Sequence, residues 1–221
     1  MRFCKAATLV TLLCICMNAQ AERFSVMVPG IPRPVTLSFP DGFRPPSSTE
    51  ERDCRERFLD FYRLNPAIKG KYTEVLLRDW KSDDRLPQIV IGALGSTEKQ
   101  QGRISQSNWQ EIREMFLKAG APEIKNIRES LRPKVEAGSP VTNVTTNELL
   151  WIEEQEDPNS VALLAQMQSQ LDGKKIDVIS ARKLLFYKGF LLFANIVVDS
   201  SKPDALRDLK TYLAAIAVED I

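Results

Sequence analysis

Two strongly apolar segments near the end of the chain restrict the fold more than any other feature of the sequence. They run over Asp177–Phe186 and Phe190–Asp199, with Tyr187-Lys188-Gly189 between them. Apolar runs on either side of a glycine-containing turn predict a β-hairpin. Ser201-Lys202-Pro203-Asp204 then caps a final helix. The side chains expected on one side of this helix are Leu206, Leu209, Leu213 and Ile216.

Two cations, Arg182 and Lys183, interrupt the first apolar segment of this hairpin. A charged side chain is costly to bury without a partner. We therefore expect both side chains to point outward or to a sheet edge, where they are solvated.

The rest of the chain predicts a mixture of strands and helices. Val161–Gln170 fits either element, and its alternation of glutamine with smaller or apolar residues favours a strand. Ser48 with Glu51 and Ser107 with Gln110 fit capping boxes at two helix starts. The other expected strands are Phe24–Val28, Val35–Phe39, Lys71–Trp80, Leu86–Leu94 and Asn147–Glu156, and the expected helices are Ser48–Arg63, Ser107–Gly120 and Pro122–Pro133. This order predicts one α+β domain over residues 22–221, a mostly antiparallel β-sheet flanked by helices.

Residues 1–21 have the pattern of a cleaved, Sec-type signal peptide. Arg2 and Lys5 precede an apolar run over Ala6–Met17, and Ala19-Gln20-Ala21 supplies the small residues required for cleavage. The apolar run is short of the roughly 20 residues that span a bilayer, although an uncleaved anchor is the alternative. We expect an exported, periplasmic or secreted protein of residues 22–221 with no transmembrane span. Cys54 is then its only cysteine, which excludes an intramolecular disulfide.

Catalytic chemistry has little support in the sequence. The chain contains no histidine, which excludes imidazole bases, Ser-His and Cys-His nucleophiles and imidazole metal ligands. No Gly-x-Ser-x-Gly elbow, glycine-rich phosphate loop or Cys-x-x-Cys pair is present. We therefore predict no catalytic, metal or cofactor site, and a protein that is not an enzyme.

Carboxylate pairs are the one feature that favours a hydrolase, because such pairs work as acid and base or bind Ca²⁺. All of them lie at or beside predicted turns, where acidic residues keep loops in water. The pairs are Asp83 with Asp84, Glu153 with Glu154, and Glu156 with Asp157.

The three tryptophans divide into one core residue and two interface candidates. Trp109 falls on the apolar stripe of its predicted helix and is expected in the core. Trp80 ends a predicted strand beside a charged loop, and Trp151 lies next to four carboxylates. Because exposed tryptophans often anchor a partner, Trp80 and Trp151 are the possible interface residues.

The order of elements is similar to that of a known family. The residues most alike are Lys188-Gly189-Phe190-Leu191-Leu192 and Ser200-Ser201-Lys202-Pro203, in the final hairpin and helix. With Phe39-Pro40-Asp41-Gly42-Phe43, they give a chain that resembles the PsbP/Mog1-like α/β/α sandwich family of exported bacterial proteins. The segment Ser48–Arg63 and the helix near Pro122 depart from it. The resemblance implies a binding or assembly role without catalysis and assigns no site residue.

Together these features predict a non-enzymatic exported protein that binds another protein in the periplasm, for example an inhibitor or immunity protein. The alternatives are a periplasmic hydrolase that uses the acidic loop residues and a small-ligand carrier with the Ile176–Val198 hairpin as a pocket wall. The formal net charge of +1 gives no reason to expect a nucleic-acid partner. The oligomeric state stays open.

Overall fold

The structure is a computed structural model of the chain. It describes residues 22–27, 31–63, 71–81, 86–94, 103–118, 142–145, 150–154, 156–171 and 174–219. The signal-peptide prediction for residues 1–21 and the helix expected over Pro122–Pro133 lie outside these ranges.

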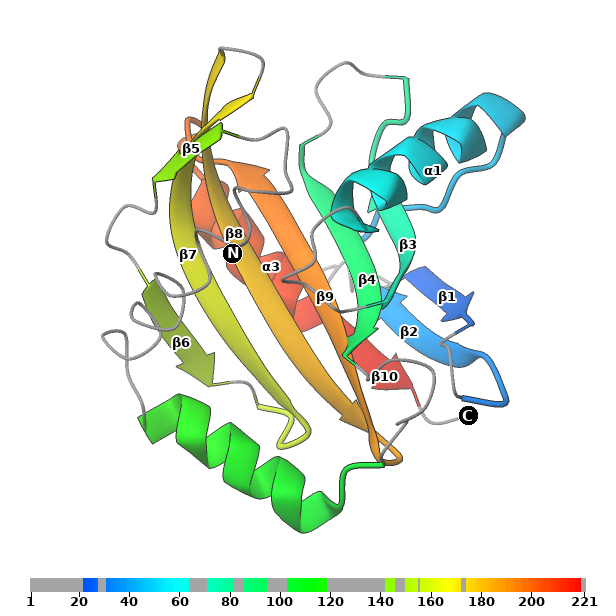
Figure 1. Cartoon of the computed structure of the whole chain (residues 1–221), viewed down its shortest axis with the longest axis vertical. Helices are drawn as coiled ribbons and strands as arrows, with labels where there is room; N and C mark the ends of the chain where they lie inside the picture. The colour runs from blue at the N-terminus through cyan, green and yellow to red at the C-terminus, as the bar shows by residue number, and fades with distance from the viewer. Residues whose placement is uncertain are drawn as a thin grey trace, which may run out of the picture.

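A seven-stranded antiparallel sheet forms the centre of the molecule (Figure 1). The predicted apolar hairpin is confirmed as β8 (Lys174–Tyr187) and β9 (Phe190–Asp199), which lie inside this sheet. The strand expected over Val161–Gln170 is also confirmed, as β7 (Ser160–Leu171), which pairs with β8 over its whole length. On the other side, β9 pairs with β4 (Gln88–Leu94), and β4 pairs with β3 (Lys71–Leu77). The short strands β5 (Thr142–Thr145) and β6 (Leu150–Glu154) both pair with β7.

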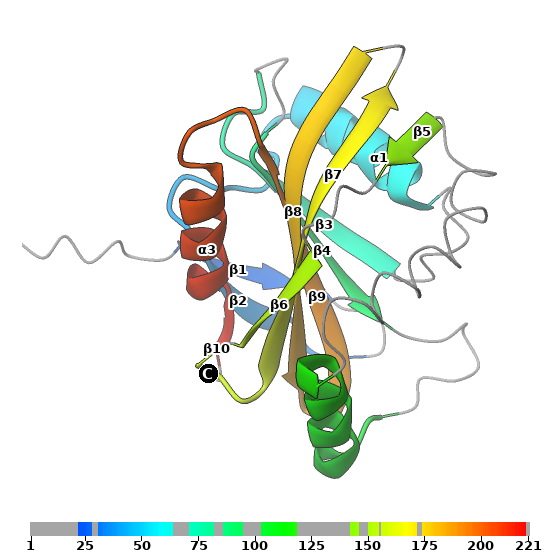
Figure 2. The ribbon, with the colours of Figure 1, turned by 90° about the vertical axis from the view of Figure 1, so that its left-hand side faces the viewer.

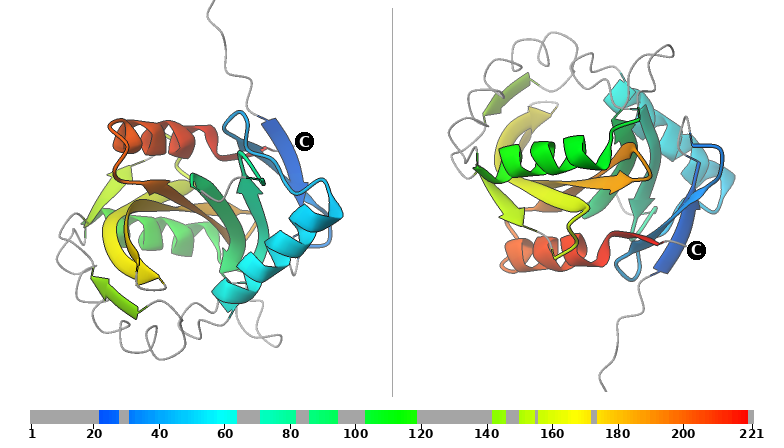
Figure 3. Two further views of the ribbon diagram at one scale, coloured as in Figure 1. Left: turned by 90° about the horizontal axis from the view of Figure 1, so that it is seen from above. Right: turned by 90° about the horizontal axis from the view of Figure 1, so that it is seen from below.

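Within the described ranges, a second sheet and three helices cover the two faces of the large sheet. The small sheet has the order β1 (Glu22–Val26), β2 (Val35–Phe39) and β10 (Ala217–Glu219). It lies with α3 (Ala205–Ala215) on one face (Figures 2 and 3). On the opposite face lie α1 (Thr49–Arg63) and the helix over residues 106–118. The predicted α+β class, an antiparallel sheet flanked by helices, is confirmed. Strand β10 was not predicted.

Each face of the large sheet has its own hydrophobic core. The core under α3 contains Leu37 of the small sheet, Ile196 of β9 and Leu209, all fully buried. The core under α1 and the 106–118 helix contains Leu59, Trp109 and Phe193. Strands β4 and β9 supply side chains to both cores, which explains why their sequences are apolar at consecutive positions. None of the helices within the described ranges has the length and apolar character that crossing a membrane requires.

Lys183 overturns the expectation of a solvated cation. It is 4% exposed, and its Nζ donates hydrogen bonds of 2.7 Å to the carbonyl oxygens of Leu213 and Ile216. These carbonyls stand at the C-terminal end of α3, where they lack partners within the helix and carry the negative end of its dipole. Burial lowers the pKa of Lys183 from 10.5 to about 8, although the Asp157 carboxylate opposes this change. The sheet thus supplies the cap of α3, and the prediction that Lys183 is solvated is wrong.

The start of α1 confirms the predicted capping box. The Glu51 amide donates to Ser48 Oγ at 3.2 Å, and the Glu51 carboxylate accepts from the Ser48 amide at 3.4 Å. The same carboxylate accepts a hydrogen bond of 2.8 Å from each of the two terminal nitrogens of Arg44. The Ser47 amide also donates to this carboxylate, at 2.6 Å. The hydrogen bond from Arg44 contributes most and that from the Ser47 amide next, and they hold the pKa of Glu51 well below its usual 4.5. The Arg44 backbone also pairs with Leu77, so this cluster fastens α1 to the end of β3.

Two local details differ from the prediction. Ser105, and not Ser107, caps the 106–118 helix, because Ser105 Oγ accepts from the Asn108 amide at 3.1 Å. Leu206 is 41% exposed, whereas Leu209, Leu213 and Ile216 are buried as expected. The core under α3 thus uses a narrower stripe of this helix than the pattern indicates.

Replacing Lys183 with methionine should change how stability depends on pH. The unfolded chain keeps the Lys183 proton up to about pH 10.5, whereas the folded protein releases it from about pH 8. Between these values the unfolded state binds more protons, so this group makes the free energy of unfolding of the wild type rise with pH. The wild-type value minus the Lys183→Met value should grow by about 1.4 kcal/mol per pH unit in that window. Urea unfolding from pH 7.5 to 10 measures it; a constant difference would contradict the burial of the ammonium.

Replacing Glu51 with glutamine should lower the melting temperature at pH 7 by several degrees, because Arg44 loses its bidentate carboxylate. The folded pKa is depressed, so the contribution is present above the unfolded value near 4.5 and is lost as the pH falls through the folded pKa. The difference between wild type and Glu51→Gln should therefore shrink below pH 4.5. Glu50→Gln, an exposed neighbour in the same helical turn, is the control in thermal melts. An equal loss in both variants would contradict this assignment.

Candidate functional site

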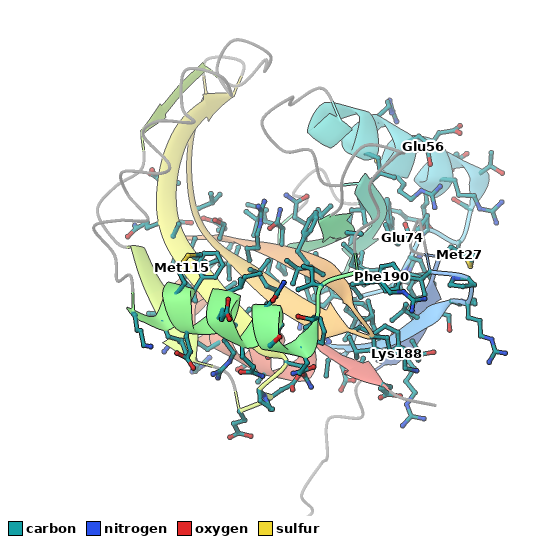
Figure 4. All side chains as sticks on the ribbon, turned by 60° about the horizontal axis from the view of Figure 1, so that its bottom comes forward. Met27, Glu56, Glu74, Met115, Lys188 and Phe190 are labelled. Carbon is teal, nitrogen blue, oxygen red and sulfur yellow. The ribbon has the colours of Figure 1, made fainter. Side chains whose placement is uncertain are left out.

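A cavity of about 660 Å³ lies at the tip of the β8–β9 hairpin; we call it the hairpin-tip pocket. It joins segments far apart in the sequence: the start of the 106–118 helix, the turn before β7, the hairpin tip and β10. Figure 4 shows Lys188 and Phe190 at this end of the sheet. The pocket is lined by Arg103, Ile104, Gln106, Asp157, Asn159, Leu185, Phe186, Tyr187, Lys188, Gly189, Ala217 and Val218.

A two-residue turn shapes one wall of the hairpin-tip pocket. Tyr187 pairs with Phe190, so Lys188 and Gly189 alone make the turn, with φ of +48° and +89°. Two successive positive φ values are typical of the type I′ turn, whose twist matches that of antiparallel strands. A Cβ at Gly189 would stand 3.1 Å from Arg103 Cβ, so glycine also allows the Arg103 segment to approach the turn closely.

Hydrogen bonds fasten the other walls to this hairpin. The Ile104 amide donates to the Gly189 carbonyl at 2.8 Å, and the Phe186 amide donates to the Asn159 carbonyl at 2.8 Å. The fully buried Trp109 stacks on Phe186 with ring centroids 5.7 Å apart. Its Nε1 donates to the Pro158 carbonyl at 3.1 Å. The pocket therefore stands on a rigid support.

Two cations and one carboxylate line the hairpin-tip pocket. The guanidinium carbon of Arg103 lies 5.7 Å from the centroid of the Phe190 ring. Lys188 Nζ lies 2.8 Å from Tyr187 Oη and 4.7 Å from the centroid of that ring. The Asp157 carboxylate accepts from the Asn159 amide at 2.8 Å and so stabilises the turn before β7. Because the two exposed cations outnumber the one carboxylate, the pocket carries a net positive charge. A negatively charged group on a ligand or partner is complementary to it.

The interface prediction for Trp80 is corrected. Trp80 is 5% exposed and packs in the core under α1. Its Nε1 donates to the Arg44 carbonyl at 3.1 Å, which satisfies the polar edge of the indole inside the protein. Trp80 is therefore not available to a partner. The backbone of Trp151 lies in β6, and its side chain is outside the described part, so its interface role stays a prediction.

The other predicted residues fall in different places. Trp109 is confirmed as a core residue. Glu156 is exposed in the turn before β7, and its neighbour Asp157 lines the hairpin-tip pocket. Asp83, Asp84 and the side chains of Glu153 and Glu154 lie outside the described part. Within the described residues, no three Cys, Asp or Glu side chains gather as a metal site.

The sequence does not single out Arg103 and Lys188 as residues of the hairpin-tip pocket. Lys188 stands in the turn that the sequence predicts, and a cation at a hairpin tip is a weak signal that could have been noted. Arg103 carries no local signal, because contacts with a distant segment, such as the hydrogen bond from the Ile104 amide to the Gly189 carbonyl, bring it to the pocket.

Comparisons with known proteins bear on the fold. No protein-family model and no curated protein sequence matches the chain. Among solved structures, it is similar to a cyanobacterial PsbP from Synechocystis sp. PCC 6803, with 10% identity, 97% of this chain and 98% of that chain covered, and a TM-score of 0.43. It is also similar to LpqN, described as involved in cell envelope biogenesis of Mycobacterium tuberculosis, with 12% identity, coverages of 90% and 91%, and a TM-score of 0.39. A Mog1 variant matches with 13% identity, coverages of 88% and 86%, and a TM-score of 0.36. PsbP and Mog1 are the proteins that name the fold expected from the sequence, and the likeness concerns the fold only.

Substituting alanine at Gly189 should disturb the hairpin-tip pocket, and Gly42 offers a matched control. Gly42 also has a positive φ, +79°, but a Cβ there would meet nothing within 4 Å. Gly42→Ala should therefore lower the free energy of unfolding by about 1 kcal/mol, from backbone strain. Gly189→Ala adds the clash with Arg103 and should cost about 1–3 kcal/mol more. Urea unfolding compares the two, and equal losses would contradict the close approach.

Proposed function

We propose that this protein is an exported, non-enzymatic binding protein, and that its partner is another protein that inserts an acidic segment into the hairpin-tip pocket. The observation that carries the proposal is the pair of cations, Arg103 and Lys188, on a rigid concave support. Fixed cations around a concave surface attract an acidic partner and define its orientation. A partner of this kind needs no reacting group in the pocket.

The proposed location is the periplasm. Support comes from the signal-peptide pattern of residues 1–21. An inhibitor or immunity protein for an enzyme of that compartment is a specific form of this function, and the identity of the partner decides it.

Charge reversal tests the proposal. Purified protein is used to capture partners from a periplasmic extract of its source, in parallel with the double variant Arg103→Glu/Lys188→Asp. Aspartate is chosen at position 188 because it tolerates a positive φ. The matched control is Arg52→Glu, an exposed reversal on α1. The wild type and the control should retain one protein in stoichiometric amount, the double variant should lose at least nine-tenths of it, and added salt should weaken capture.

Circular dichroism confirms that the double variant is folded before capture is compared. Equal capture of the same protein by wild type and double variant would exclude the hairpin-tip pocket as the contact. Recovery of no protein by the wild type would overturn the proposed function.

A further inference from the structure

Arg182 lies on the face of the large sheet opposite to Lys183. Successive residues of a strand point to opposite faces, so Lys183 reaches α3 while Arg182 lies on the side of α1 and the 106–118 helix. Its direct neighbours across the strands are Asn195 on β9 and Leu163 on β7. Arg182 was expected in solvent, but it is half-buried in the middle of the sheet.

Two contacts hold the Arg182 side chain in one orientation. Its Nε donates to Asn195 Oδ1 at 2.6 Å. The guanidinium carbon lies 5.1 Å from the centroid of the fully buried Phe193 ring. The guanidinium is therefore positioned before any ligand arrives, and this lowers the entropic cost of binding.

These contacts leave the carboxylate-binding edge of Arg182 unused. None of the described residues accepts a hydrogen bond from its two terminal nitrogens, and none accepts from the Asn195 amide group. Two other half-buried arginines have carboxylates: Arg44 pairs with Glu51 at 2.8 Å, and Arg55 pairs with Glu74 at 3.2 Å. Arg182 and Asn195 thus present a group of donors without an acidic partner in the described chain.

We propose that Arg182 and Asn195 form a binding site for a small organic carboxylate. The two terminal nitrogens match the two oxygens of a carboxylate in a bidentate pair, and the Asn195 amide adds a donor beside them. The site lies on the face of the large sheet that also carries α1 and the 106–118 helix (Figures 1 and 3), and one bidentate set of donors suits a ligand with a single carboxylate group. Leu163 and Val197, both partly buried, flank it with apolar surface.

This site is separate from the hairpin-tip pocket. The nearest residue of that pocket on the same face of β8 is Phe186, four residues and about 13 Å along the strand from Arg182. The double variant Arg103→Glu/Lys188→Asp should therefore keep its response to a carboxylate, and failure of one proposal leaves the other standing.

Titration with sodium benzoate tests the carboxylate site, with benzamide as the neutral probe and sodium chloride at equal ionic strength. NMR of the ¹⁵N-labelled protein follows the Arg182 Nε–Hε signal and the backbone amides of β8 and β9. A single half-exposed bidentate pair predicts saturable binding with a millimolar Kd for benzoate, and no response to benzamide. Absence of a saturable benzoate response in the wild type would overturn the proposal.

Two variants connect the response to these side chains. Arg182→Gln should abolish it, while Arg52→Gln on α1 should leave it unchanged. Asn195→Asp places a carboxylate beside Arg182 within the chain, so it should also abolish the benzoate response and raise the melting temperature. This variant keeps Arg182 and the shape of the side chain at position 195, so it remains informative if Arg182→Gln does not fold. A benzoate response equal to wild type in either variant would overturn the site.

Discussion

The buried ammonium of Lys183 joins the middle of the large sheet to the C-terminal end of α3. It binds the last carbonyls of α3 from the middle of β8 and so defines where the helix ends on the sheet. The chain then turns at Ile216 into β10, which pairs with β2. Ser38 Oγ donates to the Ala215 carbonyl at 3.0 Å and accepts from the Ala217 amide at 3.1 Å. The small sheet and one wall of the hairpin-tip pocket therefore depend on this helix end.

The long β8–β9 hairpin gives the protein its two candidate binding sites. Because its side chains alternate between faces, one pair of neighbours, Arg182 and Lys183, separates into a half-buried donor on one face and a buried cap on the other. The turn at its tip uses positive φ values to bring Lys188 beside Tyr187 and to admit Arg103. Strand pairing thus holds the hairpin in place. The polar groups at its tip and on one of its faces are the ones that can bind a ligand.

Most of the fold was predictable, because burial leaves a local mark on strands and helices. The hairpin, the strand over β7 and the capping box of Ser48 with Glu51 are all present as expected. The residues of the candidate sites were harder to predict from the sequence. Trp80 resembles an exposed anchor in sequence, but the Arg44 carbonyl that satisfies its indole is 36 residues away. Arg103 and Asn159 line the same pocket because their separate loops both bind the hairpin, through the Ile104 amide and the Asn159 carbonyl.

By itself, the sequence determined the strand and helix periodicity, the export signal pattern, the single cysteine of residues 22–221 and the absence of imidazole chemistry. These follow from residue type and spacing, which act over a few neighbours. Only the tertiary structure decided which charged groups are buried, which tryptophans face the core and where the donors of Arg182 and the cations of the hairpin-tip pocket converge. The physical reason is distance along the chain. The hydrogen-bond partners of a polar side chain come from other strands and helices, and only folding brings them within reach.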